Sequence, residues 1–468
     1  MSPSIFRSLT LCSTVSLTLA SGHSADTPAV TNNTRWVAIG DSITENGAAQ
    51  MWMDYFFKTR LPGLTVDILN AGIGGDTAQG ALRRMDWDVL GRNPTFATVM
   101  FGMNDVGRHL YALPEEHPDT AAQKSRMLSV YAKSLRTLVE KLKARDVRVV
   151  LMSPTPFEHS PALIQPDTPG VDAVLGQCAK ILNEIAAEAG VPMVDVHAAL
   201  EEWNTLYRQE HPKDTLIGQD RIHPGALGQF AIAVTVLDGL NIPKATQHLT
   251  VDAKSLQSDS EAIGNLRGKD GAITFDATFP TLPFVPNIPE APLDWVNRLK
   301  DGRGEDTLGV RNLAKGNYRL LANGVDCGIF SSDALAEGIS LGELAMFPLT
   351  QASKRLLQLL ATKAQETGKL RMVAWSEHFA FPEGRPEAVG VDQVEEHLRR
   401  LLKTGTQSSA ETIQRRLDVY AAFKAREPEI QAKIEALEKE ACALTKKSTV
   451  RFELRPENSS ITTTPTIP

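Results

Sequence analysis

Five short apolar runs, separated by longer stretches with helical periodicity, constrain the fold of this chain more than any other feature. The runs cover residues 36–39, 66–69, 96–101, 147–152 and 193–196. Such short, continuous runs are typical of strands buried on both faces, whereas residues 129–144 and 171–189 repeat apolar side chains at helical spacing. Strand and helix alternate, so we expect an α/β domain with a flavodoxin-like open parallel sheet flanked by helices.

Three polar segments each follow one of the first three apolar runs. They are Ile-Gly-Asp-Ser-Ile-Thr-Glu at residues 39–45, Asn-Ala-Gly-Ile-Gly-Gly-Asp-Thr at residues 70–77 and Phe-Gly-Met-Asn-Asp at residues 101–105. Ligands of open parallel sheets bind beyond the carboxyl ends of the strands, so we expect these loops to converge on one site. The site then contains a serine hydroxyl from Ser42, glycine amides from residues 72–75 and the Asn104 side chain.

A fourth segment supplies a base. Asp220 precedes His223 by three residues, so its carboxylate can reach the imidazole Nδ1 and fix the tautomer in which Nε2 faces a serine. Taken singly, Gly-Asp-Ser is an ordinary turn and Asp-x-x-His an ordinary helix start. A plain flavodoxin-like binding domain would not need the Asp220–His223 pair. The four segments in one order therefore favour acyl transfer, because serine, base and neutral amide donors are the parts that it needs.

In these four segments the sequence resembles the SGNH, or GDSL-type, hydrolase family over about residues 34–243. The resemblance implies that Ser42 is the nucleophile, His223 the base and Asp220 the residue that orients it. It also implies an oxyanion hole made of the Ser42 and Gly75 backbone amides and the Asn104 side-chain amide. Ile43 and Met103 depart from the usual family residues, but neither position needs a reactive group.

Other sites are less well supported. An α/β-hydrolase is disfavoured because Ser42 lacks the second glycine of a G-x-S-x-G elbow and follows the first strand. His159 and His197 have no metal-ligand spacing, so we predict neither a metal nor a cofactor. Trp52, Tyr55 and Phe56 could stack on a sugar ring, but their helical spacing favours the core.

The N-terminus has the pattern of a secretory signal peptide over residues 1–22, with Arg7, an apolar run at residues 9–20 and small residues after it. That run is too short to span a bilayer, so we expect a secreted or periplasmic protein without a membrane span. Three cysteines remain, Cys178, Cys327 and Cys442, and their odd number implies no disulfide framework. The net charge of −7 disfavours a nucleic-acid partner.

The pattern changes after Pro243. Residues 244–345 are predicted to be β-rich, with a hairpin at Asn323-Gly324 and a proline-laden connection at residues 280–292. Residues 346–455 carry apolar stripes at helical spacing, which favour packed helices over a coiled-coil dimer because Gly405 and Pro428 interrupt them. We expect a disordered tail over residues 456–468. The oligomeric state stays open.

These observations predict a secreted serine esterase that cleaves a small acyl ester or an acetylated glycan through an acyl-enzyme, most simply a carbohydrate O-acetylesterase. A lipase, a thioesterase, an acetyltransferase and a non-catalytic glycan-binding envelope protein are the alternatives. We also expect the segment after Pro243 to influence substrate choice, because a long surface connection could form one wall of the cleft.

Overall fold

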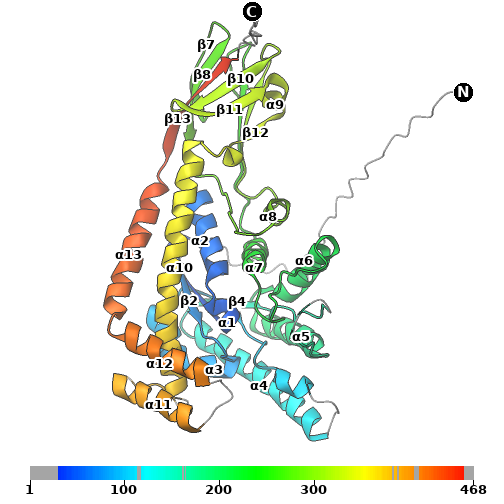
Figure 1. Cartoon of the computed structure of the whole chain (residues 1–468), viewed down its shortest axis with the longest axis vertical. Coiled ribbons are helices and arrows are strands. Elements are labelled where there is room, and N and C mark those ends of the chain that lie inside the picture. The colour runs from blue at the N-terminus through cyan, green and yellow to red at the C-terminus, as the bar shows by residue number, and fades with distance from the viewer. Residues whose placement is uncertain are drawn as a thin grey trace, which may run out of the picture.

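A five-stranded parallel sheet forms the centre of the N-terminal half (Figure 1). The computed structural model describes residues 30–112, 118–160, 163, 165–381, 384–386, 389–404 and 410–457. The strands are β1 (Thr34–Gly40), β2 (Val66–Gly72), β3 (Phe96–Met100), β4 (Arg148–Met152) and β5 (Met193–Val194). Their order, β2-β1-β3-β4-β5, confirms the expected flavodoxin-like open sheet.

Helices cover both faces of this sheet. They are α1 (Ser42–Glu45), α2 (Ala48–Arg60), α3 (Ala78–Arg84), α4 (Pro118–Lys143), α5 (Val171–Ala189), α6 (Val196–Glu210) and α7 (Ala226–Gly239). The chain moves across the sheet in one direction from β1 to β2 and in the opposite direction from β2 through β3 and β4 to β5. Because each crossover is right-handed, α2 lies on one face of the sheet, and α3, α4 and α5 lie on the other. Short helical turns lie at Met85–Val89, Leu90–Arg92, Arg108–Tyr111 and Leu341–Glu343.

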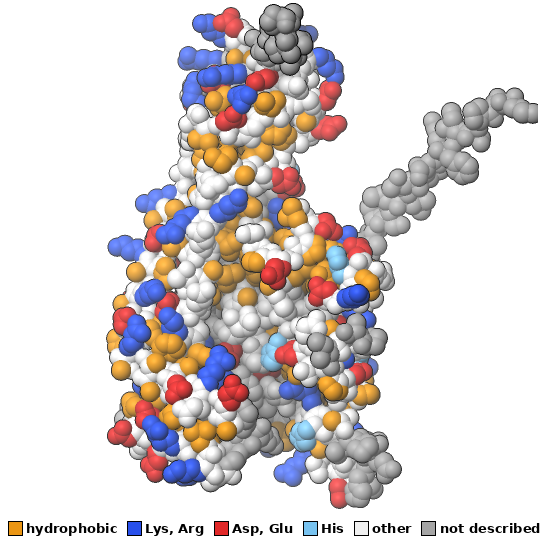
Figure 2. Space-filling model, in the orientation of Figure 1, with side chains coloured by type: hydrophobic (Ala, Val, Ile, Leu, Met, Phe, Trp, Pro, Cys, Tyr) orange, Lys and Arg blue, Asp and Glu red, His pale blue; other side chains and the backbone are white. Residues whose placement is uncertain are grey.

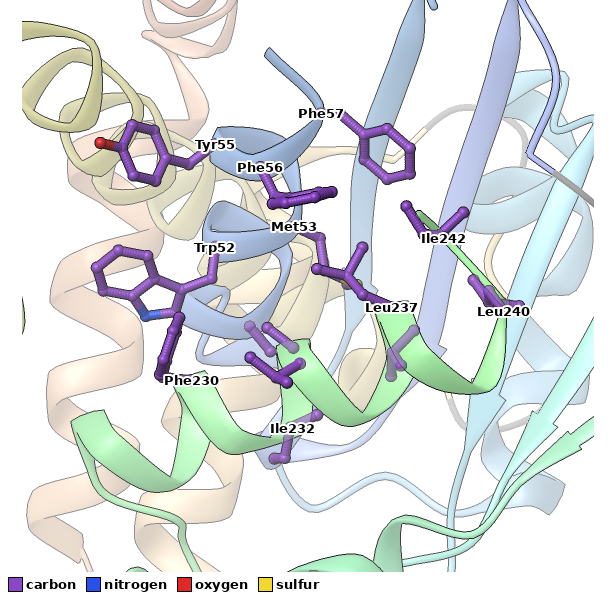
Figure 3. Close-up of a cluster of buried hydrophobic side chains, with 14 of the residues drawn as sticks. Trp52, Met53, Tyr55, Phe56, Phe57, Phe230, Ile232, Leu237, Leu240 and Ile242 are labelled. Carbon is purple, nitrogen blue, oxygen red and sulfur yellow. The ribbon is translucent and has the colours of Figure 1, made fainter. Parts of the chain in front are cut away.

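The α2 face is packed with aromatic side chains. Trp52, Tyr55 and Phe56 are buried, so their interpretation as core residues is right. Trp52 meets Phe230 of α7 edge to face, with ring centroids 5.2 Å apart, and Figure 3 shows α2 and α7 side by side with these rings between them. Phe284 of the proline-laden connection stacks on Phe230 and touches Tyr55 and Phe56. The connection is therefore part of the same core.

The residues after Pro243 begin with two small sheets. Their strands are β6 (Gln247–Asp252), β7 (Ile263–Lys269), β8 (Ala272–Phe279), β9 (Asp306–Arg311), β10 (Asn317–Ala322), β11 (Val325–Ser331) and β12 (Ile339–Ser340). Helix α8 (Leu293–Lys300) and helix α9 (Ser332–Glu337) lie between strands. β10 and β11 pair antiparallel around Asn323-Gly324, as the hairpin signal predicts. Residues 244–345 are thus β-rich.

Four helices and a final strand complete the chain. They are α10 (Pro348–Ala380), α11 (Val391–Thr404), α12 (Ala410–Lys424), α13 (Glu427–Leu444) and β13 (Ser448–Pro456). The helical region was expected to reach residue 455, but it ends at Leu444, and β13 lies between β10 and β8 in the larger sheet. Val450, Phe452 and Leu454 alternate with polar residues and are buried there. This period of two indicates a strand, so the predicted boundary is wrong.

The C-terminal helices run back along the N-terminal domain, as Figure 1 shows for α10 beside α2. Lys58 of α2 and Lys363 of α10 both form ion pairs with Asp54 and with Glu438 of α13, at 2.6–3.0 Å. Buried Arg60 pairs with Asp306 of β9 at 2.7 Å. Because a buried guanidinium left without its carboxylate is strongly unfavourable, this pair fastens the β-rich region to α2, as the lysine pairs fasten α10 and α13.

Two predicted segments, the signal peptide and most of the tail from residue 458, lie outside the described residues. Within the described ranges, no helix is both long and apolar enough to cross a bilayer.

Candidate functional site

Ser42 follows the carboxyl end of strand β1, as the first residue of α1. The preceding residue, Asp41, caps this helix by accepting a hydrogen bond from the Ile43 N–H at 2.9 Å. The turn is tight: a Cβ on Gly72 of the neighbouring strand would lie 2.1 Å from the Glu45 nitrogen, so only glycine fits there. Strand β1 and this cap therefore fix the Ser42 hydroxyl at the carboxyl ends of the strands.

The Ser42 Oγ lies 2.7 Å from the His223 Nε2, across 181 residues of sequence. On the other side of the ring, the His223 Nδ1 lies 2.5 Å from the Asp220 Oδ2. The second Asp220 oxygen accepts hydrogen bonds from the backbone amides of Ile222 and His223. Burial would raise the pKa of Asp220, but these hydrogen bonds and the charge of His223 lower it below its ordinary value.

The loop that carries this pair is held by Arg221, a residue that the sequence analysis did not select. Arg221 has a φ of 69° and is buried. Its guanidinium donates to the carbonyl oxygens of Glu158, Ser160 and Gln165 at 2.7–2.9 Å. In the sequence, Arg221 is an arginine two residues before a histidine, and only the fold shows that it anchors the loop.

Gly75 and Asn104 lie on the loops after the two strands that flank β1. Gly75 is exposed, has a φ of 79° and has open space where a Cβ would be. The Asn104 Nδ2 donates to the Asp76 carbonyl oxygen at 2.9 Å, and its second hydrogen is left for another acceptor. Because α1 starts at Ser42, the Ser42 N–H also lies outside the helical ladder. The fold thus brings the five predicted residues to one edge of the sheet.

Two buried carboxyl groups lie behind this edge. Burial raises the pKa of Asp41 to about 6 and that of Asp105 to about 8. The Asp105 Oδ1 accepts from the Ala78 N–H at 2.8 Å, and its Oδ2 has no partner among the described residues. Asp105 is therefore neutral at pH 7, which limits the negative charge beside the three donors.

Buried Arg84 connects the loops that carry Ser42 and Gly75. Its guanidinium donates to the carbonyl oxygens of Gly40 and Ala71 and to the carboxylates of Asp76 and Asp88. These contacts join the ends of β1 and β2 to the loop after β2. Sequence reasoning did not find Arg84, because an arginine in a helix is usually a solvated residue.

A cavity of about 400 Å³ lies between the N-terminal ends of α2 and α7, the proline-laden connection and α10. Its lining is mostly apolar and consists of Ala48, Met51, Trp52, Ala226, Asn287, Ile288, Pro289, Lys354, Leu357, Gln358 and Ala361. Ala226 follows His223 by three residues, so their Cα atoms are within about 11 Å. Figure 2 shows this face of the molecule hollowed between the C-terminal helices and the helices of the N-terminal domain. All three parts of the chain form its walls.

Elsewhere in the described residues, histidine and carboxylate side chains form small groups. Among the described residues, no group of three or more His, Cys, Asp and Glu side chains could hold a metal ion. His159 pairs with Asp167, and His197 lies between Asp172 and Glu201. The described site is therefore a serine, an imidazole, a carboxylate and three N–H donors, which is the set that acyl transfer needs.

The chain is similar in sequence to a family of acylhydrolases and to two bacterial proteins. Residues 38–230 match the GDSL-like lipase/acylhydrolase family. The acetylxylan esterase of Geobacillus stearothermophilus is 28% identical over 211 residues, which cover 42% of this chain and 88% of that enzyme. An uncharacterized lipoprotein of Bacillus subtilis (strain 168) is 34% identical over 129 residues, 26% of this chain and 48% of that protein.

One solved structure resembles almost the whole chain. It is a gut microbial diltiazem-metabolizing enzyme, and it aligns with a TM-score of 0.82 over 91% of this chain and 98% of its own, at 22% identity. At this identity the likeness concerns the fold. The β-rich and helical regions are therefore part of a recurring architecture together with the N-terminal domain.

Proposed function

We propose that Ser42, His223 and Asp220 are the catalytic residues of this chain, an SGNH-type ester hydrolase whose residues 38–230 match the GDSL-like lipase/acylhydrolase family. The observation that carries this assignment is the 2.7 Å contact between the Ser42 Oγ and the His223 Nε2, with Asp220 on the opposite ring nitrogen. A base in contact with a hydroxyl, and itself held by a third group, is the arrangement that activates a nucleophile.

In the proposed reaction, the His223 Nε2 takes the proton of Ser42 as the Oγ attacks the ester carbonyl. The Ser42 and Gly75 backbone amides and the Asn104 amide donate hydrogen bonds to the resulting oxyanion. When the tetrahedral intermediate collapses, His223 returns the proton to the departing alcohol and leaves an acyl-serine. Water, deprotonated by His223, then releases the acid. Asp220 stabilises the imidazolium in both steps.

We propose acetyl groups on a carbohydrate as the substrate. The acetylxylan esterase of Geobacillus stearothermophilus supports this choice, because it is similar to this chain over 88% of its own length. The apolar cavity near His223 favours the main alternative, an ester with a longer or bulkier apolar group. A series of p-nitrophenyl esters from acetate to octanoate, assayed beside an acetylated xylan, separates the two. A kcat/KM that rises with chain length would reject the acetylesterase proposal.

We further propose that residues 1–22 are a signal peptide and that the mature protein is exported. The lipoprotein relative of Bacillus subtilis supports an extracytoplasmic location. N-terminal sequencing of the mature protein, recovered from fractionated cells, tests the proposal. A cytoplasmic protein that keeps its apolar N-terminal run would contradict it.

The nucleophile itself is tested by labelling. A fluorophosphonate should modify the purified protein once, and mass spectrometry should locate the adduct on the peptide that contains Ser42. Labelling of Ser42→Ala at another serine, or full esterase activity of that variant, would refute the assignment.

A further inference from the structure

Three side chains of α10 bind the loop that carries Gly75. Arg371, Trp375 and His378 are spaced by four and three residues, so they lie on one face of the helix. The Arg371 Nε donates to the Gly72 carbonyl oxygen at 3.0 Å, and the Trp375 Nε1 donates to the Gly74 carbonyl oxygen at 2.8 Å. The His378 Nε2 lies 3.1 Å from the Asp76 Oδ1.

The Trp375 contact acts on the peptide unit that contains the Gly75 amide. In a planar trans peptide, the C=O of one residue and the N–H of the next point in opposite directions. Because the indole of Trp375 holds the Gly74 carbonyl, it also fixes the direction of the Gly75 N–H, which points away from α10. A hydrogen bond to the carbonyl polarises the amide as well, so that the Gly75 N–H becomes a stronger donor.

The Gly74–Gly75 peptide is the central peptide of a turn that is closed by the hydrogen bond from the Asp76 N–H to the Ile73 carbonyl oxygen at 3.1 Å, a bond that does not hold this peptide directly. Gly74 and Gly75 carry no side chains, and Gly75 is exposed with a φ of 79°. Two adjacent glycines have more backbone freedom than any other pair, so an unrestrained peptide between them would rotate easily. A donor that stabilises a transition state must be fixed before the reaction, because reorientation during catalysis costs free energy.

The indole is itself held in place. Trp375 is mostly buried, and the guanidinium of Arg416 from α12 lies over its ring, 3.8 Å from the ring centroid. Arg371 forms a bidentate ion pair with buried Asp88, at 2.6 and 2.7 Å, which fixes α10 against the helical turn Met85–Val89. The face of α10 is thus a rigid support, some 300 residues downstream of the loop.

We propose that Trp375 is a positioning residue of the oxyanion hole: its indole N–H orients the Gly74–Gly75 peptide so that the Gly75 amide meets the developing oxyanion. This inference rests on the proposed function, and it assigns a catalytic contribution to the helical region that lies outside the family match. The N-terminal domain supplies the donors, and α10 supplies the restraint on one of them.

The test compares Trp375→Phe with Trp295→Phe. Phenylalanine keeps an aromatic ring at residue 375 but removes the N–H, so the Gly74 carbonyl loses its donor. Trp295 is a matched control, because it is also buried and its Nε1 donates to Glu210 at 2.8 Å, away from the loop. Kinetics on p-nitrophenyl acetate are normalised to the end-point of fluorophosphonate labelling, so that only folded, active molecules are counted.

We expect Trp375→Phe to lower kcat by about threefold to thirtyfold, less than the 10²-fold to 10³-fold typical of deleting an oxyanion donor. KM and the pH profile should not change, because neither Ser42 nor His223 contacts Trp375. The rate of fluorophosphonate labelling should fall with kcat, and Trp295→Phe should resemble the wild type. An unchanged kcat, or a rise in KM alone, would overturn the proposal.

Two further variants keep the result interpretable. If Trp375→Phe does not fold, Arg416→Gln takes its place, since it frees the indole without removing the N–H. We then expect about a twofold to fivefold loss in kcat at constant KM, and wild-type kcat overturns the proposal. Ser42→Ala separates the two levels of inference: an active Ser42→Ala protein refutes the proposed function, whereas an inactive one beside a fully active Trp375→Phe refutes only the role of Trp375.

Discussion

Replacing Asp220 by asparagine should abolish most of the activity while leaving the loop intact. In the native site, one Asp220 oxygen accepts two backbone N–H groups and the other faces the His223 Nδ1. Asparagine can keep the first two bonds through its carbonyl oxygen, which places its NH₂ group against Nδ1. Since two donors cannot face each other, the imidazole must carry its hydrogen on Nε2, and it can then no longer accept the Ser42 proton.

The structure sets the expected size of this effect. Wrong tautomers in such triads cost about 10⁴-fold in kcat, and the three donors that remain preserve some catalysis. We therefore expect kcat on p-nitrophenyl acetate to fall by about 10³-fold to 10⁴-fold, with KM and the thermal unfolding midpoint close to those of the wild type. Both side chains are about half exposed, at 47% and 48%, so little packing is lost.

A matched control lies in the same chain. His159 and Asp167 form a second Nδ1-to-carboxylate contact, at 2.7 Å and at similar exposures of 39% and 38%, but among the described residues no hydrogen bond joins that ring to a serine. Asp167→Asn should leave kcat unchanged. If Asp220→Asn retains more than about a tenth of wild-type kcat, Asp220 does not set the tautomer of His223. If Asp167→Asn costs as much as Asp220→Asn, the loss reflects a general effect on the fold.

Four other outcomes are expected. Ser42→Ala and His223→Ala should each remove nearly all esterase activity, and the double variant should lose little more, because triad members act as a unit; additive losses would contradict the assignment. Asn104→Ala should lower kcat by about 10²-fold to 10³-fold at nearly constant KM, and a rise in KM alone would make Asn104 a substrate-binding residue. Burial raises the pKa of Asp105 to about 8 in the folded protein, so the contribution of Asp105 to the free energy of unfolding should fall by about 1.4 kcal/mol per pH unit between about pH 4 and pH 8. The stability difference between the wild type and Asp105→Asn should change with pH by that slope in unfolding experiments, and parallel curves would disprove the raised pKa. A version of the chain that ends at Pro243 should be poorly soluble and inactive, and a soluble version with unchanged activity on a small ester and on acetylated xylan would show that the later regions have no role.

The fold of the N-terminal half and the members of the site could be predicted from sequence because their signals are local. A strand buried on both faces is a short apolar run, and a functional loop follows it directly, so Ser42, Gly75 and Asn104 are found by position along the chain. His223 is found through its spacing from Asp220. The 2.7 Å contact between Ser42 and His223 itself joins residues 181 positions apart, and no spacing rule contains it.

The predicted end of the helical region failed for a different reason. Val450, Phe452 and Leu454 carry the period of two that indicates a strand. However, β13 pairs with β8 and β10, which precede it by more than 120 residues. A strand at the end of a helical region has no neighbour in sequence with which to form a hairpin, so its pattern was assigned to the region around it.

The restraint on the Gly75 loop shows most clearly what local patterns omit. Arg371, Trp375 and His378 belong to a helix whose apolar and polar residues look like those of any packed helix, and a tryptophan at helical spacing is normally a core residue. Trp375 is indeed mostly buried, but its N–H must still find an acceptor, and that acceptor is the Gly74 carbonyl. The helical region is thus connected to the site because the buried Trp375 N–H requires a hydrogen-bond acceptor. For the same reason, the regions after Pro243 cannot be treated as passengers: removing α10 would take the Trp375 donor from the Gly74 carbonyl and the Arg371 guanidinium from the buried Asp88 carboxylate, which would keep only Arg84 and Arg92.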